Sequence, residues 1–161
     1  MTSAEANKAI VQKWLSSGVS SPEGLAMVTD DFRWVAPKSM AEMFPNGEPE
    51  LVGPQGLRDI PILDKALYRG YEVAANNSNV HFMIAEGDIV VMEFDAKFTS
   101  FEGEAYHNNY CLVFFLRDGK VAKVHEHVDS QYSYELMMGT PEKKAGVLDR
   151  LARLRRGEVV C

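Results

Sequence analysis

The chain has 161 residues, of which 46% are hydrophobic and 25% are charged, and its formal net charge at pH 7 is −6. This length and composition predict one globular domain with an ample core. The acidic balance excludes the basic surface typical of nucleic-acid-binding proteins, and the two cysteines, Cys111 and Cys161, make neither a disulfide framework nor a zinc site. The first residues lack the basic region and apolar run of a signal peptide, so we expect a cytoplasmic protein without a membrane partner.

Three helices and one strand are expected in the first part of the chain. Residues 2–18 predict a helix with capping-box spacing at its start. Residues 21–28 predict a second, shorter helix, because Pro22 suits a first helical position. Residues 30–35 have the pattern of a strand, and residues 56–69 that of the third helix.

A long segment, residues 36–53, lies between this strand and the third helix. It contains three prolines, two methionines and Phe44. A loop of this length in a compact domain is often functional, which favours a flap beside a binding site. A plain surface excursion fits the same composition, so both interpretations stay open.

The third helix carries an acidic residue in an apolar position. Leu57, Ile60, Asp64 and Leu67 share one arc of the helix at spacings of three and four residues. A carboxylate in the middle of an apolar face is a candidate acid or base. The alternative is a structural aspartate that backbone N–H groups or an arginine satisfy.

The second half of the chain is organised around a four-stranded antiparallel meander. The expected strands are residues 80–85, 89–100, 104–116 and 121–129. Asp118-Gly119 between two apolar runs is the strongest hairpin signal, because both positions tolerate a positive φ. Two further helices are expected after the meander, over residues 130–138 and 141–156.

The hairpin at Asp118-Gly119 predicts that Arg117 lies opposite Lys120 and Glu126 opposite Cys111. Alternation along the last strand then places Glu126 in an otherwise apolar row. A carboxylate in such a row must be paired, hydrogen-bonded or raised in pKa by desolvation, which is how general acids and bases arise. The predicted neighbours on its face are Cys111, Asn109, Val113 and, further out, His107.

The other face of the same two strands is a rival site. Tyr106, Asn108, Tyr110, His127 and Asp129 would line it, with His127 and Asp129 as the acid/base set. Because alternation does not say which face of a sheet is concave, both faces stay open at this point.

A metal site is the third arrangement that the strands suggest. His125 and His127 stand two residues apart, and His107 or His81 would have to join them. The predicted register puts His107 on the opposite face from both. Two histidines without a third ligand make a poor metal site, so no metal is expected.

The order of elements resembles the nuclear-transport-factor-2-like superfamily, in particular its SnoaL-like and ketosteroid-isomerase-like members. The resemblance covers about residues 7–136 and rests on three segments in this order and spacing: Tyr106-His107-Asn108-Asn109-Tyr110, Asp118-Gly119-Lys120-Val121 and His125-Glu126-His127-Val128-Asp129. It implies an α+β fold, with a strongly curved, mostly antiparallel sheet wrapped around a pocket that three N-terminal helices close, as a cone-shaped barrel. Residues 1–139 would form this domain and residues 140–161 a C-terminal helical tail.

The resemblance also implies a chemistry. Enzymes of this kind hold no cofactor and tend to carry an acid/base carboxylate on the last strand, where Glu126 stands. Glu126 and Asp64 would share the acid and base roles, and His107 would orient a carbonyl or stabilise an oxyanion. The expected substrate contacts are Trp34, Tyr68, Asn109, Cys111, Met92 and Phe94.

Two departures from the family limit what carries over. Limonene-epoxide-hydrolase-like enzymes use an Asp-Arg-Asp arrangement, whereas the strand over residues 89–100 carries Glu93 and Asp95 but no arginine. The tyrosine and protonated aspartate of true ketosteroid isomerases have no matching positions that can be assigned residue by residue.

The sequence therefore predicts a cofactor-independent acid/base enzyme of the lyase or isomerase/cyclase type that acts on a hydrophobic, aromatic or polycyclic small molecule. A homodimer through the outer face of the sheet is expected. Two alternatives remain. Water activation as in epoxide hydrolases would be favoured by Arg33 or Arg58 reaching the pocket, and a non-catalytic binding or dimerisation domain by a solvent-exposed Glu126.

Overall fold

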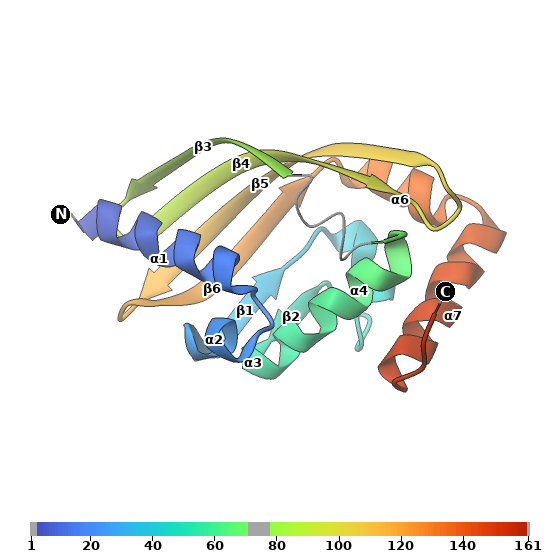
Figure 1. Cartoon of the computed structure of the whole chain (residues 1–161), viewed down its shortest axis with the longest axis horizontal. Coiled ribbons are helices and arrows are strands. Elements are labelled where there is room, and N and C mark those ends of the chain that lie inside the picture. Colours follow the sequence, from blue (N-terminus) through green and yellow to red (C-terminus); the bar gives the residue numbers. More distant parts are fainter. Residues whose placement is uncertain (1–2, 71–77, 161) are drawn as a thin grey trace.

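The computed structural model describes residues 3–70 and 78–160. It shows a six-stranded sheet in the order β2-β1-β6-β5-β4-β3, which lies over the N-terminal helices (Figure 1). The strands are β1 (Val28–Val35), β2 (Glu50–Val52), β3 (Ser78–Glu86), β4 (Ile89–Thr99), β5 (Ala105–Arg117) and β6 (Lys120–Val128). β1 and β6 pair in parallel, and the other neighbours are antiparallel. The predicted α+β fold with a mostly antiparallel sheet is confirmed.

Short helices connect and cover the strands. They are α1 (Ser3–Ser17), α2 (Pro22–Ala26), η1 (Lys38–Met43), α3 (Gly53–Gly56), η2 (Leu57–Asp59), α4 (Ile60–Leu67), α6 (Ser130–Met138) and α7 (Pro141–Arg155). The expected cap at Thr2 lies outside the described residues. The third predicted helix is divided into α3, η2 and α4, and the predicted loop over residues 36–53 contains η1 and the edge strand β2, which is too short to show an alternating pattern.

The hairpin between β5 and β6 forms as predicted. Asp118 and Gly119 have φ angles of 52° and 72°, and Arg117 pairs with Lys120. Leu116 next pairs with Val121. The turn chemistry therefore determined the start of this strand pair.

A β-bulge then changes the register. Leu116 pairs with Val121, but Phe115 pairs with Lys123, so Ala122 is an extra residue without a partner. Such a bulge shifts every later pair by one position and reverses the parity of the strand that carries it. The predicted register beyond the hairpin is therefore wrong by one residue.

The bulge determines which side chains share a face with Glu126. Glu126 lies opposite Leu112, and Cys111 lies opposite His127. We call the face covered by the helices the inner face and its reverse the outer face. On β5, the inner face carries Tyr106, Asn108, Tyr110, Leu112 and Phe114, and the outer face carries His107, Asn109, Cys111, Val113 and Phe115.

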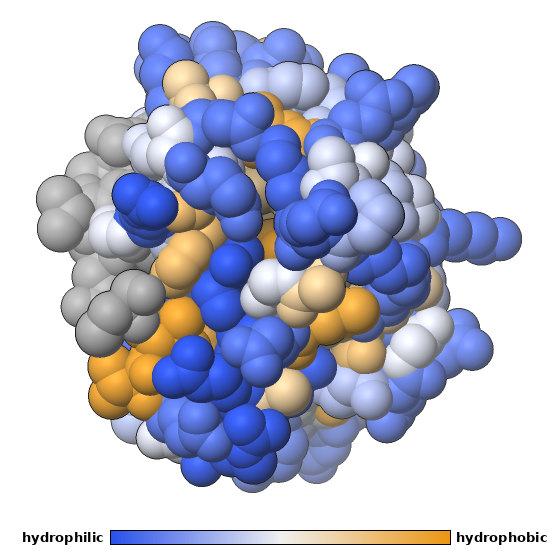
Figure 2. Space-filling model, turned by 90° about the vertical axis from the view of Figure 1, so that its right-hand side faces the viewer, coloured by the Kyte–Doolittle hydropathy of each residue, from blue (hydrophilic) through white to orange (hydrophobic). Residues whose placement is uncertain are grey.

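The C-terminal helix α7 packs on the rest of the domain. Its residues Val147 and Leu151 are buried in the same core as Ala66 of α4, and Arg150 Nε donates to the Ala66 carbonyl at 2.7 Å. At this end of the molecule the surface is mostly hydrophilic, with apolar atoms in separate patches (Figure 2). None of the described helices is long and apolar enough to cross a membrane. The division into a domain over residues 1–139 and a helical tail over residues 140–161 stays a prediction.

Candidate active site

A cavity of about 540 Å³ lies between the inner face of the sheet and the helices. Its walls come from α1, β1, η1, β2, α4, β3, β4, β5, β6 and α6 and are mainly apolar. Cavities of this size hold small organic molecules. The polar groups that break the apolar lining therefore indicate what the cavity can do.

Glu126 is the first of these polar groups. Its side chain faces the cavity from β6, and its Oε2 accepts a hydrogen bond from Trp34 Nε1 at 2.7 Å. Burial among protein atoms raises the pKa of the carboxyl above its usual range, and the Trp34 hydrogen bond opposes part of this rise. Among the described residues, no other hydrogen bond reaches this carboxylate, so Oε1 is left for a ligand or a proton.

Asp64 and Tyr68 lie on the α4 side of the same cavity. The apolar arc of the helix positions Asp64 as predicted, and its carboxylate acts electrostatically on the Tyr68 phenol. Tyr68 is buried and stacks on Phe98 with 4.4 Å between ring centroids. Burial is the main reason why the pKa of Tyr68 lies well above its usual value, so this phenol stays protonated at neutral pH.

A buried network holds a second phenol, Tyr110, at the cavity wall. The Tyr110 and Tyr106 hydroxyls are 2.7 Å apart, and the Tyr106 hydroxyl is 2.9 Å from Ser133 Oγ. Asn108 Nδ2 donates to the Tyr106 hydroxyl at 3.0 Å and to Ser133 Oγ at 2.9 Å. Burial raises the pKa of Tyr110, and the nearby Glu126 adds to the rise. The network therefore offers a fixed, neutral hydroxyl close to the carboxylate.

Part of the predicted apolar wall lies at the cavity. Trp34, Met92 and Phe94 line the cavity, as do Met43 and Phe44 from the segment over residues 36–53. The prolines and apolar side chains of this segment were the only sign that it could reach a pocket. Contact of these side chains with a substrate stays a prediction.

Three predicted site residues are not at the cavity. His107, Asn109 and Cys111 lie on the outer face, because the bulge at Ala122 reverses the parity between β5 and β6. His107 Nε2 instead lies 2.9 Å from Asp95 Oδ2. The prediction that these three side chains are neighbours of the last-strand carboxylate is wrong.

The rival site is also divided by the bulge. His127 is exposed on the outer face, and Asp129 caps α6 by accepting the Tyr132 N–H at 3.0 Å. In contrast, Tyr106, Asn108 and Tyr110 stand on the inner face. The cavity therefore brings Glu126 of the first predicted site together with Tyr110 of the rival site. Among the described residues, no group of three or more His, Cys, Asp or Glu side chains is arranged to hold a metal ion.

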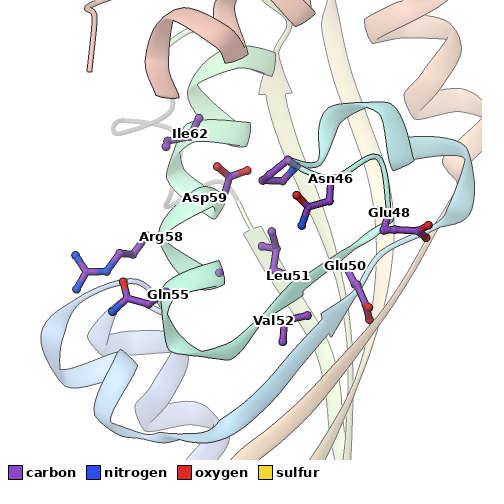
Figure 3. Close-up of a pocket in the computed structure, with 11 residues that line it drawn as sticks. Asn46, Glu48, Glu50, Leu51, Val52, Gln55, Arg58, Asp59 and Ile62 are labelled. Carbon is purple, nitrogen blue, oxygen red and sulfur yellow. The ribbon is translucent and has the colours of Figure 1, made fainter. Parts of the chain in front are cut away.

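Neither arginine that would favour water activation reaches the cavity. The Arg33 guanidinium is paired with Glu50, with Nε to Oε2 at 3.0 Å. Arg58 lines a separate surface pocket of about 370 Å³ beside β2 and η2, where Figure 3 shows it pointing away from Asp59 and Ile62. Among the described lining residues, the cavity has no guanidinium.

Solved structures with the same fold are numerous but distant in sequence. An NTF2-like protein of unknown function from Burkholderia pseudomallei K96243 has a TM-score of 0.66 and 17% identity, over 86% of this chain and 99% of that one. TerC co-crystallized with polyporic acid has a TM-score of 0.64 and 20% identity, over 81% and 97%. A candidate SnoaL-like polyketide cyclase from Jannaschia sp. CCS1 has 0.64 and 14%, over 86% and 95%. At these identities the likeness shows the fold alone.

No curated protein sequence matches the chain significantly. The profile of the SnoaL-like domain, however, matches residues 21–124, which include β1, η1, α4 and the meander as far as the middle of β6. Because this match covers more than half of the 161 residues, the chain belongs to the SnoaL-like domain family.

Proposed function

We propose that the protein is a cofactor-independent acid/base enzyme, of the lyase or isomerase/cyclase type, for a hydrophobic aromatic or polycyclic small molecule. The observation that carries this proposal is the position of Glu126. Its carboxylate faces an apolar cavity, has a raised pKa and keeps one oxygen without a protein donor among the described residues. A group whose pKa lies closer to neutrality can take up a proton in one step and return it in the next.

The proposed reaction begins at a carbon next to a carbonyl group. The deprotonated Glu126 takes a proton from that carbon, and the electron pair of the broken C–H bond moves into the carbonyl to form an enolate. The protonated carboxyl then returns the proton to another carbon, or gives it to a leaving hydroxyl. Both routes, isomerisation and loss of water, conserve atoms and electrons without a cofactor.

Tyr68 and Tyr110 would stabilise the enolate oxygen. Both phenols line the cavity, and burial keeps both protonated at neutral pH. A neutral O–H group fixed in place before the reaction stabilises developing negative charge without reorganisation. The Tyr106 hydroxyl, 2.7 Å from that of Tyr110, holds this second donor in position.

The fold neighbours support the substrate class. One neighbour is a candidate SnoaL-like polyketide cyclase, and TerC was co-crystallized with polyporic acid. A cavity of about 540 Å³ has room for small organic molecules. The neighbours do not identify the substrate, because one fold carries many chemistries.

The two alternatives receive less support. Water activation would benefit from a cation at the cavity, and no arginine is among its described lining residues. A desolvated carboxylate with a raised pKa is typical of catalytic acids and bases, which favours an enzyme over a plain binding domain. The homodimer stays a prediction. Its interface would use the apolar side chains exposed on the outer face, which include Phe82, Ile84 and Ile89. Sedimentation at rising protein concentration would measure whether the dimer forms.

Exchange of carbon-bound hydrogen for deuterium tests the base directly. α-Tetralone, a bicyclic aryl ketone, is incubated with the protein in D₂O, and loss of the proton signal next to the carbonyl is followed by NMR. We expect the wild type to accelerate this exchange and Glu126→Gln to lose ~10²–10⁴-fold of the acceleration, as for removal of a general base. Carboxyl-carbon NMR of the same proteins should show that Glu126 titrates above the ~4.3 of a free glutamate.

Glu93→Gln is the matched control. Glu93 also lies on the central strands but points to the outer face, opposite Cys111. It should exchange the probe at the wild-type rate. Equal rates for the wild type and Glu126→Gln, or an ordinary pKa for Glu126, would contradict the proposal.

A further inference from the structure

The ionisable groups of the cavity are all acidic or phenolic. Among the described lining residues they are Asp64, Tyr68, Tyr110 and Glu126, and none is a lysine, arginine or histidine. An anionic ligand would lose its hydration without gaining a cationic partner there. The cavity therefore disfavours carboxylate and phosphate ligands.

Three arginines, Arg33, Arg58 and Arg155, lie outside the cavity. Arg33 pairs with Glu50, and Arg155 Nη2 lies 2.7 Å from Asp59 Oδ2. Arg58 belongs to the separate surface pocket of Figure 3. None of these three guanidinium groups therefore offsets the acidic lining.

Aromatic rings surround the same space. Phe94 and Tyr110 stack with 5.1 Å between centroids, and Tyr68 stacks on Phe98. Trp34, which donates to Glu126, completes this set. Aromatic faces attract organic cations, most strongly where water is excluded, and they also pack well on flat ligands.

From the acidic lining, the aromatic rings and Glu126 Oε1, which has no donor among the described residues, we infer that the cavity selects hydrophobic amines. The ligand would be an aromatic or polycyclic molecule whose protonated amine donates to Oε1 of Glu126 while its rings pack on the aromatic wall. This inference rests on the proposed function and names the substrate class for the same site. Because a carboxylate oxygen has two lone pairs, Oε1 can accept from the amine and still take the substrate proton. A carbonyl elsewhere on such a molecule would still meet the phenols.

Three probes with one ring system test the selection. They are 1-naphthylmethylamine, 1-naphthalenemethanol and 1-naphthaleneacetic acid, which are cationic, neutral and anionic at pH 7. Dissociation constants are measured by calorimetry with the whole chain. We expect the amine to bind on the order of tenfold more tightly than the alcohol, because its hydrogen bond to the carboxylate is charge-assisted, and the acid to bind more weakly than both.

The Glu126→Gln variant assigns the preference to the carboxylate. In this variant the amine should bind no more tightly than the alcohol, while alcohol binding changes less than about threefold. Retained alcohol binding also shows that the cavity has kept its shape. Glu93→Gln, altered on the outer face, should keep the wild-type order of all three probes.

Two results would overturn the inference. One is equal binding of the amine and the alcohol to the wild type, and the other is an amine preference that survives in Glu126→Gln. Either result leaves the proposed function intact if Glu126→Gln still loses deuterium exchange of α-tetralone. Conversely, a clear amine preference with unchanged exchange would reject the base role and leave an amine-binding protein.

Discussion

The inner and outer faces of one sheet each carry a carboxylate, and the pKa values of the two carboxylates move in opposite directions. Glu126 faces the cavity, where burial raises its pKa. Asp95 faces outward between His81 and His107, and hydrogen bonds from these two histidines lower its pKa to about 2. Both side chains are ordinary acids on neighbouring parts of one fold. The environment of each face, and not the residue type, therefore sets the direction in which the pKa of its carboxylate moves.

The same contrast holds for residues of one type that stand next to each other on β5. Phe114 and Asn108 point inward and are buried, whereas Phe115 and Asn109 point outward. Substitution of each pair removes the same atoms from two environments. Such pairs of variants measure how strongly the two faces differ.

The largest effect is expected for Phe114→Ala. Phe114 is 0% exposed and contacts Trp14 edge-to-face, so its removal leaves a core cavity and should cost about 3–5 kcal/mol of unfolding free energy. Phe115→Ala should cost about 1 kcal/mol, because that ring is partly exposed beneath the Lys123 ammonium. Denaturant unfolding of both variants measures the difference, and equal losses would mean that the outer face is buried in solution by a partner.

Asn108→Ala should have the next largest effect. It removes the donor to Tyr106 and Ser133 and leaves buried hydroxyls with fewer partners, at a cost of about 2 kcal/mol. The adjacent change Asn109→Ala on the outer face should stay within about 0.5 kcal/mol. A small loss for Asn108→Ala in urea unfolding would show that water replaces its hydrogen bonds.

Glu126→Gln should stabilise the protein at neutral pH. A carboxyl whose pKa is raised by folding binds its proton more tightly in the folded state, so unfolding free energy falls as pH rises from the unfolded value of ~4.3 through the folded value. Glutamine removes this loss. The variant should therefore melt above the wild type at pH 7 and close to it at about pH 4. A melting temperature below that of the wild type at pH 7 would argue against a desolvated carboxylate.

Asp95→Asn should show the smallest effect, with a different dependence on pH. The lowered pKa of Asp95 contributes stability above its unfolded value of ~3.9, and this contribution is lost as pH falls toward 2. The raised pKa of His81, caused mainly by Asp95, contributes below ~6.5 and is lost as pH rises through the folded value. The free energy of unfolding of the variant should thus fall furthest below that of the wild type between about pH 4 and 6.5. Melting curves of both proteins at about pH 5.5 and 9 would measure this difference. A loss that is equal at both pH values would exclude the histidine interaction.

Local patterns in the sequence determined most of the architecture. The Asp118-Gly119 turn, the meander and the start of α6 at Ser130 follow from turn chemistry and alternation, which act over a few residues. The apolar arc of the helix placed Asp64 at an apolar face, and alternation along the last strand did the same for Glu126. Membership of the SnoaL-like domain family agrees with the order of these elements.

Only the tertiary structure decided which side chains meet at the cavity. One extra residue, Ala122, turns the rest of β6 by one position, and no local signal distinguishes this alanine from its neighbours. The bulge joins Glu126 to Tyr110 and moves His107 to the outer face. A strand has a period of two, so its sequence predicts which residues share a face, but pairing across a bulge depends on how the whole sheet packs on its helices.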